Sequence, residues 1–240
     1  MIRLFIRGDL GPGAAIAPTL DQSRYLTQVM RLKAGDALLV FNGRDGEWRA
    51  SIAEVLKKGV ILRADEQTRP QTDAPDVELL MAVIKKAPLE YAVEKATELG
   101  VRRVRLIRTR RSTAEHLRLD RLDAIAEESA EQCGRLDVPP VDDPVKLDAL
   151  LDSWEGSRRL LFCDETGGPA AAVTLRDQPR GPWSILIGPE GGFAPEERDR
   201  LLALPGAVPV SLGPRILRAD TAAGAALTLW QSTLGDWRQE

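Results

Sequence analysis

The 240-residue sequence lacks any uninterrupted apolar run long enough to cross a bilayer. Its N-terminus also lacks the basic segment and apolar stretch of a secretory leader. These two absences predict a cytoplasmic protein with no membrane partner. The composition, with 43% hydrophobic and 29% charged residues, is that of an ordinary globular protein with a core of its own.

Cysteine and histidine are scarce. Cys133 and Cys163 are the two cysteines, and neither stands in a CxxC pair or beside a histidine cluster. This excludes a disulfide framework and argues against a cysteine-based site, so no metal is expected. The single histidine, His116, follows a Ser-Thr-Ala-Glu stretch and is interpreted as a solvated loop residue.

The net charge of −3 hides an uneven distribution of basic residues. Residues 1–70 contain 11 Lys and Arg against 8 Asp and Glu, and the remainder is acidic. Within that remainder, residues 85–111 contain nine basic side chains and three acidic ones. The overall charge argues against a protein that coats nucleic acid indiscriminately, but it allows a basic patch.

The chain divides into two parts by pattern. In residues 36–65 the Asn-Gly and Asp-Gly steps of "NGRDG" (42–46) predict a tight turn, and β-branched residues alternate with polar ones on either side of it. This pattern predicts a small all-β module. The polar segment "QTRPQTDAP" (residues 67–75) has two prolines and no apolar periodicity. We therefore expect one domain over residues 1–70 and a second over residues 74–240.

The second part alternates strands and helices, which predicts an α/β domain with a mostly parallel sheet and helices on both faces. Its first strand is the apolar run at 77–84, and its first helix, 88–100, has a proline at the start and Gly100 as a cap. The remaining segments are strands at 101–107, 158–163, 183–187 and 207–212, and helices at 118–134, at 195–204 and from about Ala219.

Two irregular loops follow two of these strands directly. "GPEGG" comes after "WSILI", and "LGPRILR" comes after "AVPVSL". Ligands of open parallel sheets bind beyond the carboxyl ends of the strands, and glycine lets the backbone approach a ligand closely. One such loop could be a plain tight turn, but two at strand ends favour a binding site. Neither G-x-G-x-x-G nor Gly-Lys-Ser/Thr is present, so a phosphate cradle is not indicated.

"ILIGPEGGF" (185–193) and "LGPRILRADTA" (212–222) resemble the two signature segments of the RsmE family of bacterial ribosomal RNA methyltransferases, which are members of the knotted SPOUT class. Further similar segments, in the same order, are Arg3-Leu4-Phe5, "VMRLKAGD" (29–36), "EYAVEKATELGV" (90–101) and "EQCGR" (131–135). The resemblance covers essentially the whole chain. Two positions depart from it: the family usually has Arg-Thr-Glu-Thr-Ala where this chain has Arg218–Ala222, and a histidine is common where Tyr25 stands.

The resemblance implies an N-terminal PUA-like β-barrel that helps to grip RNA and a SPOUT domain whose C-terminal loops form a trefoil knot. Periodicity cannot predict a knot, and chains in general avoid them. It also implies S-adenosylmethionine as cofactor, a homodimer through the SPOUT domain, and methylation of N3 of one uridine in 16S rRNA, either naked or in the small ribosomal subunit.

Carried onto this sequence, the resemblance implies a cofactor pocket formed by Ile187, Gly188, Pro189, Glu190, Gly191, Gly192, Leu212, Gly213, Ile216, Leu217 and Arg218. Glu190 could face the cationic cofactor or hold the loop through backbone N–H groups. Because uridine N3 must lose a proton, a fixed cation near the uracil oxygens would stabilise the developing charge, and Arg218 is the candidate. Asp220 could deprotonate N3 or orient Arg218. Alternatively, it could cap the last helix.

The predicted RNA contacts are basic side chains: Arg3, Arg24, Arg31, Lys33, Lys85, Lys86 and the arginines from Arg102 to Arg111. Each could instead be a solvated surface charge, and the alternate arginines of "VRRVRLIR" could be the polar face of an edge strand. As a set they predict RNA affinity that falls steeply with salt. The last helix, which contains Trp230, is expected to serve the dimer interface as well as the core.

Three other functions compete with this interpretation. A SPOUT relative could methylate a ribose hydroxyl or another base, and the RsmE-like N-terminal module argues against that. A non-catalytic RNA-binding assembly factor could have kept the fold, and the intact pair of loops disfavours it. Nucleotide hydrolysis is the least supported, because no phosphate motif is present.

Overall fold

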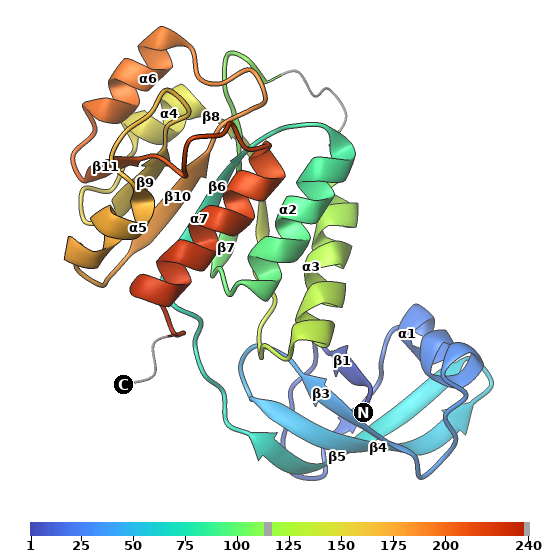
Figure 1. Cartoon of the computed structure of the whole chain (residues 1–240). Coiled ribbons are helices and arrows are strands. Elements are labelled where there is room, and N and C mark those ends of the chain that lie inside the picture. The colour runs from blue at the N-terminus through green and yellow to red at the C-terminus, as the bar shows by residue number, and fades with distance from the viewer. Residues whose placement is uncertain (113–116, 238–240) are drawn as a thin grey trace. The chain divides into compact units, whose positions relative to one another are not determined.

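The computed structural model describes residues 1–112 and 117–237, and within them the chain forms two compact units (Figure 1). Unit 1 consists of Met1–Asp73 together with Ala130–Val138, and unit 2 consists of Ala74–Ser129 and Pro139–Glu240. The sequence pattern did not separate residues 130–138 from the second domain, because residues 130–134 form the end of the helix predicted at 118–134. His116, interpreted above as a solvated loop residue, lies outside the described residues.

Unit 1 is built on a five-stranded sheet in the order β1-β3-β4-β5-β2. The strand β1 pairs in parallel with β3, and the other neighbours are antiparallel. The strands are β1 (Arg3–Phe5), β2 (Ala15–Ile16), β3 (Ala37–Phe41), β4 (Glu47–Leu56) and β5 (Gly59–Arg69). A short helix, α1 (Leu20–Arg24), continues directly into one π-helical turn, η1 (Tyr25–Val29).

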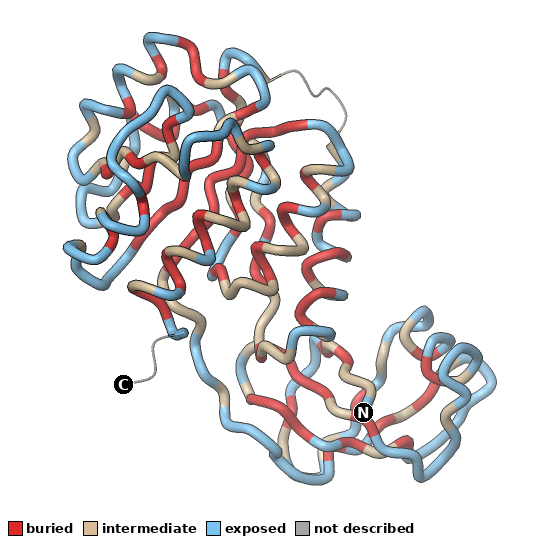
Figure 2. Tube along the Cα trace, in the orientation of Figure 1, coloured by how far each residue is buried: buried red, intermediate tan, exposed pale blue. Residues whose placement is uncertain are grey.

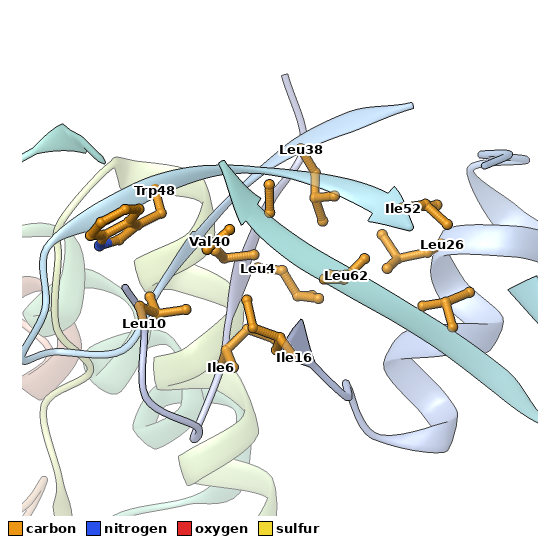
Figure 3. Packing of buried hydrophobic residues seen from close by; sticks show 13 residues of the cluster. Leu4, Ile6, Leu10, Ile16, Leu26, Leu38, Val40, Trp48, Ile52 and Leu62 are labelled. Carbon is orange, nitrogen blue, oxygen red and sulfur yellow. The ribbon is translucent and has the colours of Figure 1, made fainter. Parts of the chain in front are cut away.

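The core of unit 1 follows from the alternation of apolar side chains along these strands (Figure 3). Leu38 and Val40 of β3 are fully buried, and they pack with Ile52 and Leu62 from the neighbouring strands. The predicted turn between β3 and β4 is confirmed, because both of its glycines, Gly43 and Gly46, have positive φ.

Unit 2 contains a six-stranded sheet in the order β11-β9-β10-β6-β7-β8, and every neighbouring pair is parallel. The strands are β6 (Val77–Ala82), β7 (Arg103–Arg108), β8 (Val141–Lys146), β9 (Arg159–Cys163), β10 (Trp183–Ile187) and β11 (Ala207–Val210). The central strands β6 and β10 are buried at every position (Figure 2). This confirms the predicted α/β class.

The helices of unit 2 connect these strands. They are α2 (Lys86–Glu98), α3 (Leu119–Cys133), α4 (Leu147–Asp152), α5 (Ala171–Thr174) with the 3₁₀ turn η2 (Leu175–Asp177), α6 (Pro195–Leu202) and α7 (Ala219–Thr233). The helix α3 runs from unit 2 into the segment that belongs to unit 1.

The helices α2 and α7 lie side by side against the sheet (Figure 1). The predicted cap of α2 is confirmed, because Gly100 has a φ of 77°. The Gln231 side chain of α7 donates to the Leu99 carbonyl at 2.6 Å and so satisfies a backbone acceptor at the end of α2. Among the described helices, none combines the length and the apolar character needed to span a bilayer.

Candidate functional site

A cavity of about 540 Å³ opens beyond the carboxyl ends of β9, β10 and β11. Its walls come from three loops that follow these strands, together with the start of α7. The loops are residues 164–168, 188–192 and 211–218. This is the edge at which open parallel sheets bind ligands, and the volume is within the range of small-molecule pockets.

The structure brings most of the predicted cofactor residues together in the wall of this cavity. Those that line it are Ile187, Gly188, Pro189, Glu190, Gly192, Leu212, Gly213, Ile216, Leu217 and Arg218. Gly191 does not line it, and its carbonyl accepts a hydrogen bond from Arg111 Nη1 at 2.8 Å. The side chain of Ile216 lies at the mouth of the cavity and is 88% exposed.

The glycines of the loop after β10 are required by packing at one end and by backbone conformation at the other. A Cβ at Gly188 would lie 2.7 Å from the ring of Phe193, which folds back over that position. The Phe193 ring makes an edge contact with Phe162 at a centroid distance of 5.5 Å. Gly192 has a φ of 66°, a conformation that favours glycine. The loop is therefore a sharp turn closed by its own aromatic residue.

The loop after β7 braces this turn from outside the cavity. Glu197, which is buried, accepts hydrogen bonds from the Arg110 amide at 2.8 Å and from the Ala194 amide at 2.9 Å. Arg111 adds its bond to Gly191, and the Arg110 side chain pairs with Glu196. Part of the predicted basic run thus supports the loop after β10.

Other arginines of that run form ion pairs across the sheet. Arg103 and Arg105 both approach Asp142 of β8, at 3.5 and 3.8 Å. Arg105 also lies 3.7 Å from the buried carboxylate of Glu78. The alternative that these arginines mark an edge strand is wrong, because β7 has β6 on one side and β8 on the other.

The third wall of the cavity, residues 163–168, was missed by the sequence interpretation. Asp164 is buried, and its carboxylate accepts bonds from Arg198 and from the amide and hydroxyl of Thr166. Burial alone would raise the pKa of Asp164, but these hydrogen bonds outweigh it and hold the pKa below its usual value. The available signal was "CDETGG", a polar loop with two glycines directly after a buried strand.

The thiol of Cys163 also lines the cavity. Burial raises the pKa of this thiol to about 12, which favours its protonated form at neutral pH. Within the described ranges, no cluster of His, Cys, Asp or Glu is arranged to hold a metal ion.

The acid that holds the glycine loop is Glu165. Its Oε1 accepts a hydrogen bond from the Phe193 amide at 3.3 Å. The side chain of Glu190, for which that role was an alternative, is exposed and makes no hydrogen bond within the described part of the chain.

Arg218 and Asp220 lie at the start of α7. Arg218 is the N-cap residue and lines the cavity, and its side chain has no ion pair or hydrogen bond among the described residues. Asp220 is the second residue of the helix, where its Oδ1 accepts the Thr221 amide at 2.8 Å, and it lies outside the cavity wall. The alternative that Asp220 is the N-cap is wrong, although an acid in the first turn is still favourable for the helix dipole.

The guanidinium of Arg3 is already bonded within the protein. Its Nε pairs with Glu47 at 2.7 Å, and its Nη atoms donate to three carbonyls at the end of α3 and just beyond it. The guanidinium also stacks on Phe41 at 4.4 Å, and the side chain is only 10% exposed. The prediction that Arg3 contacts RNA is corrected here: Arg3 ties residues 130–138 to the sheet of unit 1.

The predicted RNA contacts outside the arginine run, which are Arg24, Arg31, Lys33, Lys85 and Lys86, are exposed. On unit 1, Arg24 forms a solvent-exposed pair with Asp21, Lys33 is exposed, and Arg31 has a φ of 58°. A positive φ is uncommon for arginine. On unit 2, Lys85 and Lys86 lie at the start of α2, where Lys86 is 3.9 Å from Glu90. Trp230 of α7 is buried, and its Nε1 has no hydrogen-bond partner among the described residues.

Two family models match the chain: an RNA methyltransferase domain over residues 72–231 and an RNA methyltransferase PUA domain over residues 18–65. The chain is 34% identical to the ribosomal RNA small subunit methyltransferase E of Synechocystis sp., covering 89% of this chain and 72% of that protein. It is 29% identical to the protein of the same name from Rickettsia conorii, covering 94% and 93%.

Solved structures are similar over the same range. A methyltransferase from Legionella pneumophila, in complex with its bound cofactor SAM, is 31% identical with a TM-score of 0.87, covering 98% of each chain. A ribosomal RNA small subunit methyltransferase E from Neisseria gonorrhoeae is 24% identical with a TM-score of 0.89, covering 99% of this chain and 100% of that one, which is a likeness of fold.

Proposed function

This chain belongs to the ribosomal RNA small subunit methyltransferase E family, and we propose that it transfers the methyl group of S-adenosylmethionine to N3 of one uridine in 16S rRNA. The observation that carries the proposal is the cavity at the carboxyl ends of β9, β10 and β11, because both family loops line it.

The cavity suits S-adenosylmethionine, which supplies an electrophilic methyl group on a sulfonium. Backbone groups at Gly188, Gly192 and Gly213 can approach a ligand without interference from a Cβ. Ile187 and Leu217 offer apolar contact for an adenine, and Ile216 at the mouth would be covered by the bound ligand. Glu190 is proposed to face the cationic sulfonium, since this residue lines the cavity and is exposed.

Arg218 is the proposed catalytic residue. Uridine N3 becomes nucleophilic when its proton leaves, and negative charge then develops on the uracil oxygens. A guanidinium in the cavity wall with no partner of its own among the described residues can stabilise that charge. Asp220 is proposed to accept the proton from N3, because its carboxylate keeps acceptor capacity after bonding the Thr221 amide.

The proposed RNA contacts are the exposed basic side chains Arg24, Arg31, Lys33, Lys85 and Lys86. Arg31 supports this assignment, because a residue held in the left-handed region costs about 1–3 kcal/mol and such strain is concentrated at functional sites. The substrate is 16S rRNA, either naked or within the small subunit.

A homodimer through unit 2 and a trefoil knot formed by its C-terminal loops belong to the same proposal. The support for the knot is that β11 pairs with β9, while the loops after β10 and β11 line one cavity. The dimer is checked by sedimentation equilibrium, for which we expect twice the chain mass of 26.3 kDa. A monomeric mass at micromolar concentration would contradict it.

The reaction is tested by incubating the protein with labelled S-adenosylmethionine and either small subunits or naked 16S rRNA from cells that lack the endogenous activity. Mass spectrometry of the nucleosides should find N3-methyluridine at one site. A methylated ribose or another methylated base would replace the proposed specificity. Cofactor binding without methylation of either substrate would point to another RNA, and absence of cofactor binding to an assembly factor.

A further inference from the structure

Glu165 joins the two loops that follow the adjacent strands β9 and β10. One carboxylate oxygen accepts the Phe193 amide at 3.3 Å. That oxygen also occupies the space in which a Cβ at Gly192 would have to lie. A glycine at 192 therefore leaves room for the Glu165 carboxylate as well as permitting the positive φ.

Glu165 is one of three acids in the cavity wall, and the three differ in what their oxygens already bind. The carboxylate of Asp164 is enclosed and is held by Arg198 and Thr166. Glu190 makes no hydrogen bond in the described ranges. Glu165 is exposed, and a carboxylate has about four acceptor positions. It therefore keeps the capacity to accept donors from a ligand while it holds the loop.

Resting on the proposed function, we propose that Glu165 is a positioning residue that accepts hydrogen bonds from the ribose 2′ and 3′ hydroxyls of the cofactor. A vicinal diol presents two neighbouring donors, and a carboxylate can accept both at once. Dinucleotide-binding folds use an acid for a ribose hydroxyl in the same way. The side chains of the two cations in the wall, Arg215 and Arg218, have no acceptor atoms.

With this assignment, Glu165 also links ribose binding to the loop after β10. The same carboxylate holds the amide of Phe193, whose ring closes the glycine loop over Gly188. Ribose binding and the order of the loop are thus coupled through one side chain. The ribose is thereby fixed relative to the loop after β10.

The experiment is isothermal titration of the full chain with S-adenosylmethionine, with S-adenosylhomocysteine and with the 2′,3′-dideoxy analogue of S-adenosylhomocysteine. The proteins are the wild type, Glu165→Ala, Glu165→Gln and, as a matched control, Glu155→Gln, an exposed acid of unit 2 outside the cavity wall. Glu165→Ala should weaken S-adenosylhomocysteine about 10- to 100-fold, because hydrogen bonds to a charged acceptor are lost. Glu165→Gln should be intermediate, since its carbonyl oxygen still accepts.

The dideoxy analogue separates ribose recognition from loop support. Glu165→Ala should weaken binding of the dideoxy analogue by a clearly smaller factor than it weakens S-adenosylhomocysteine, because the hydroxyl bonds are already absent and only the support of the Phe193 amide is lost. An equal loss for both ligands would overturn the proposal and leave Glu165 as a support of the loop alone. A loss for S-adenosylmethionine without a loss for S-adenosylhomocysteine would also overturn it, since the carboxylate would then recognise the sulfonium.

The test also distinguishes this proposal from the proposed function. Tight binding by the wild type that persists in both Glu165 variants would remove Glu165 from the cofactor site and leave the methyltransferase assignment intact. If the wild type bound neither S-adenosylmethionine nor S-adenosylhomocysteine, the proposed function itself would fail. Urea midpoints within error of the wild type establish that each variant is folded.

Discussion

Arg218 and Arg215 are the basic side chains of the cavity wall, and they differ in position. Arg218 is the N-cap residue of α7, so the helix fixes its backbone, whereas Arg215 lies in the preceding irregular loop. A fixed cation is the better electrostatic catalyst, because it needs no reorganisation as charge develops.

Replacing Arg218 with Ala should lower kcat for rRNA methylation about 100-fold or more, as the loss of one preorganised donor does in other enzymes. The KM for S-adenosylmethionine should change little, because the charge stabilised here develops only in the transition state. Initial rates with labelled cofactor measure both constants. Arg176→Ala, at an exposed site outside the cavity, is the control, and an undiminished kcat in Arg218→Ala would remove Arg218 from the mechanism.

Arg3 shows how a predicted ligand contact can be a structural residue. Its Ala variant would leave the buried Glu47 carboxylate without its closest partner and would uncap three carbonyls of residues 130–135. Removing one partner of a buried pair costs about 3–5 kcal/mol. Hydrogen exchange of the β3 and β4 amides measures the stability of unit 1 directly.

Arg24→Ala serves as the control for that measurement, because its pair with Asp21 is exposed and is expected to contribute less than about 1 kcal/mol. If Arg3→Ala protected these amides as well as the wild type does, the structural assignment of Arg3 would be wrong.

At the scale of elements, strands with strong turn signals were predictable and strands without them were not. The bounds of β10 agree with the prediction, because a Gly-Pro step follows the strand directly. The strand β8 was missed, since "VDDPVK" contains two acids and a proline. The helix α2 begins two residues before its expected start, so Pro88 is its third residue.

Two walls of the cavity were predictable and the third was not. Both predicted loops matched family segments that contain a Gly-Pro step. The loop after β9 matched no family segment. Its place in the site depends on strand order, because β9 lies between β10 and β11 in the sheet although it precedes both in the chain. Sequence order alone does not reveal such a neighbour. Asp164 and Glu165 were therefore left out of the predicted site.

The close packing of Phe193 against Gly188 leads to a further prediction. In Gly188→Ala the new methyl group would lie 2.7 Å from the Phe193 ring and would displace it from Phe162. Overpacking of this kind costs about 1–3 kcal/mol, and the displaced loop should bind S-adenosylmethionine about tenfold or more weakly by titration calorimetry. Gly156→Ala is the matched control, because a Cβ there meets no atom within 4 Å.

A second substitution separates steric clash from a direct role of Gly188. In Gly188→Ala combined with Phe193→Leu, the smaller side chain makes room for the methyl group, and part of the lost affinity should return. No recovery in the double variant would contradict the packing explanation.

At the scale of the whole molecule, the chain is acidic overall yet offers basic side chains at selected positions, among them Lys85 and Lys86. RNA binding through these groups releases counterions, so the logarithm of the affinity should fall linearly with the logarithm of the salt concentration. Lys85→Ala/Lys86→Ala should make that slope shallower by about 1 to 2, as filter binding across a salt series would measure.

Lys95→Ala is the control on the same helix. Hydrogen bonds to Glu94 and then to Glu98 raise the pKa of Lys95 above its usual value and hold the ammonium away from a phosphate. Its loss should leave the salt slope unchanged. Equal slopes in the wild type and in Lys85→Ala/Lys86→Ala would contradict the assignment of these lysines to RNA.

The central claim is that one cavity of unit 2 holds the cofactor and directs its methyl group toward Arg218. A crystal structure of the protein grown with S-adenosylmethionine tests this most directly. The account predicts the adenosine among residues 164–168, 188–192 and 211–218, with the sulfonium methyl on the side of Arg218. A cofactor bound outside these loops, or with its methyl group turned away from Arg218, would contradict it.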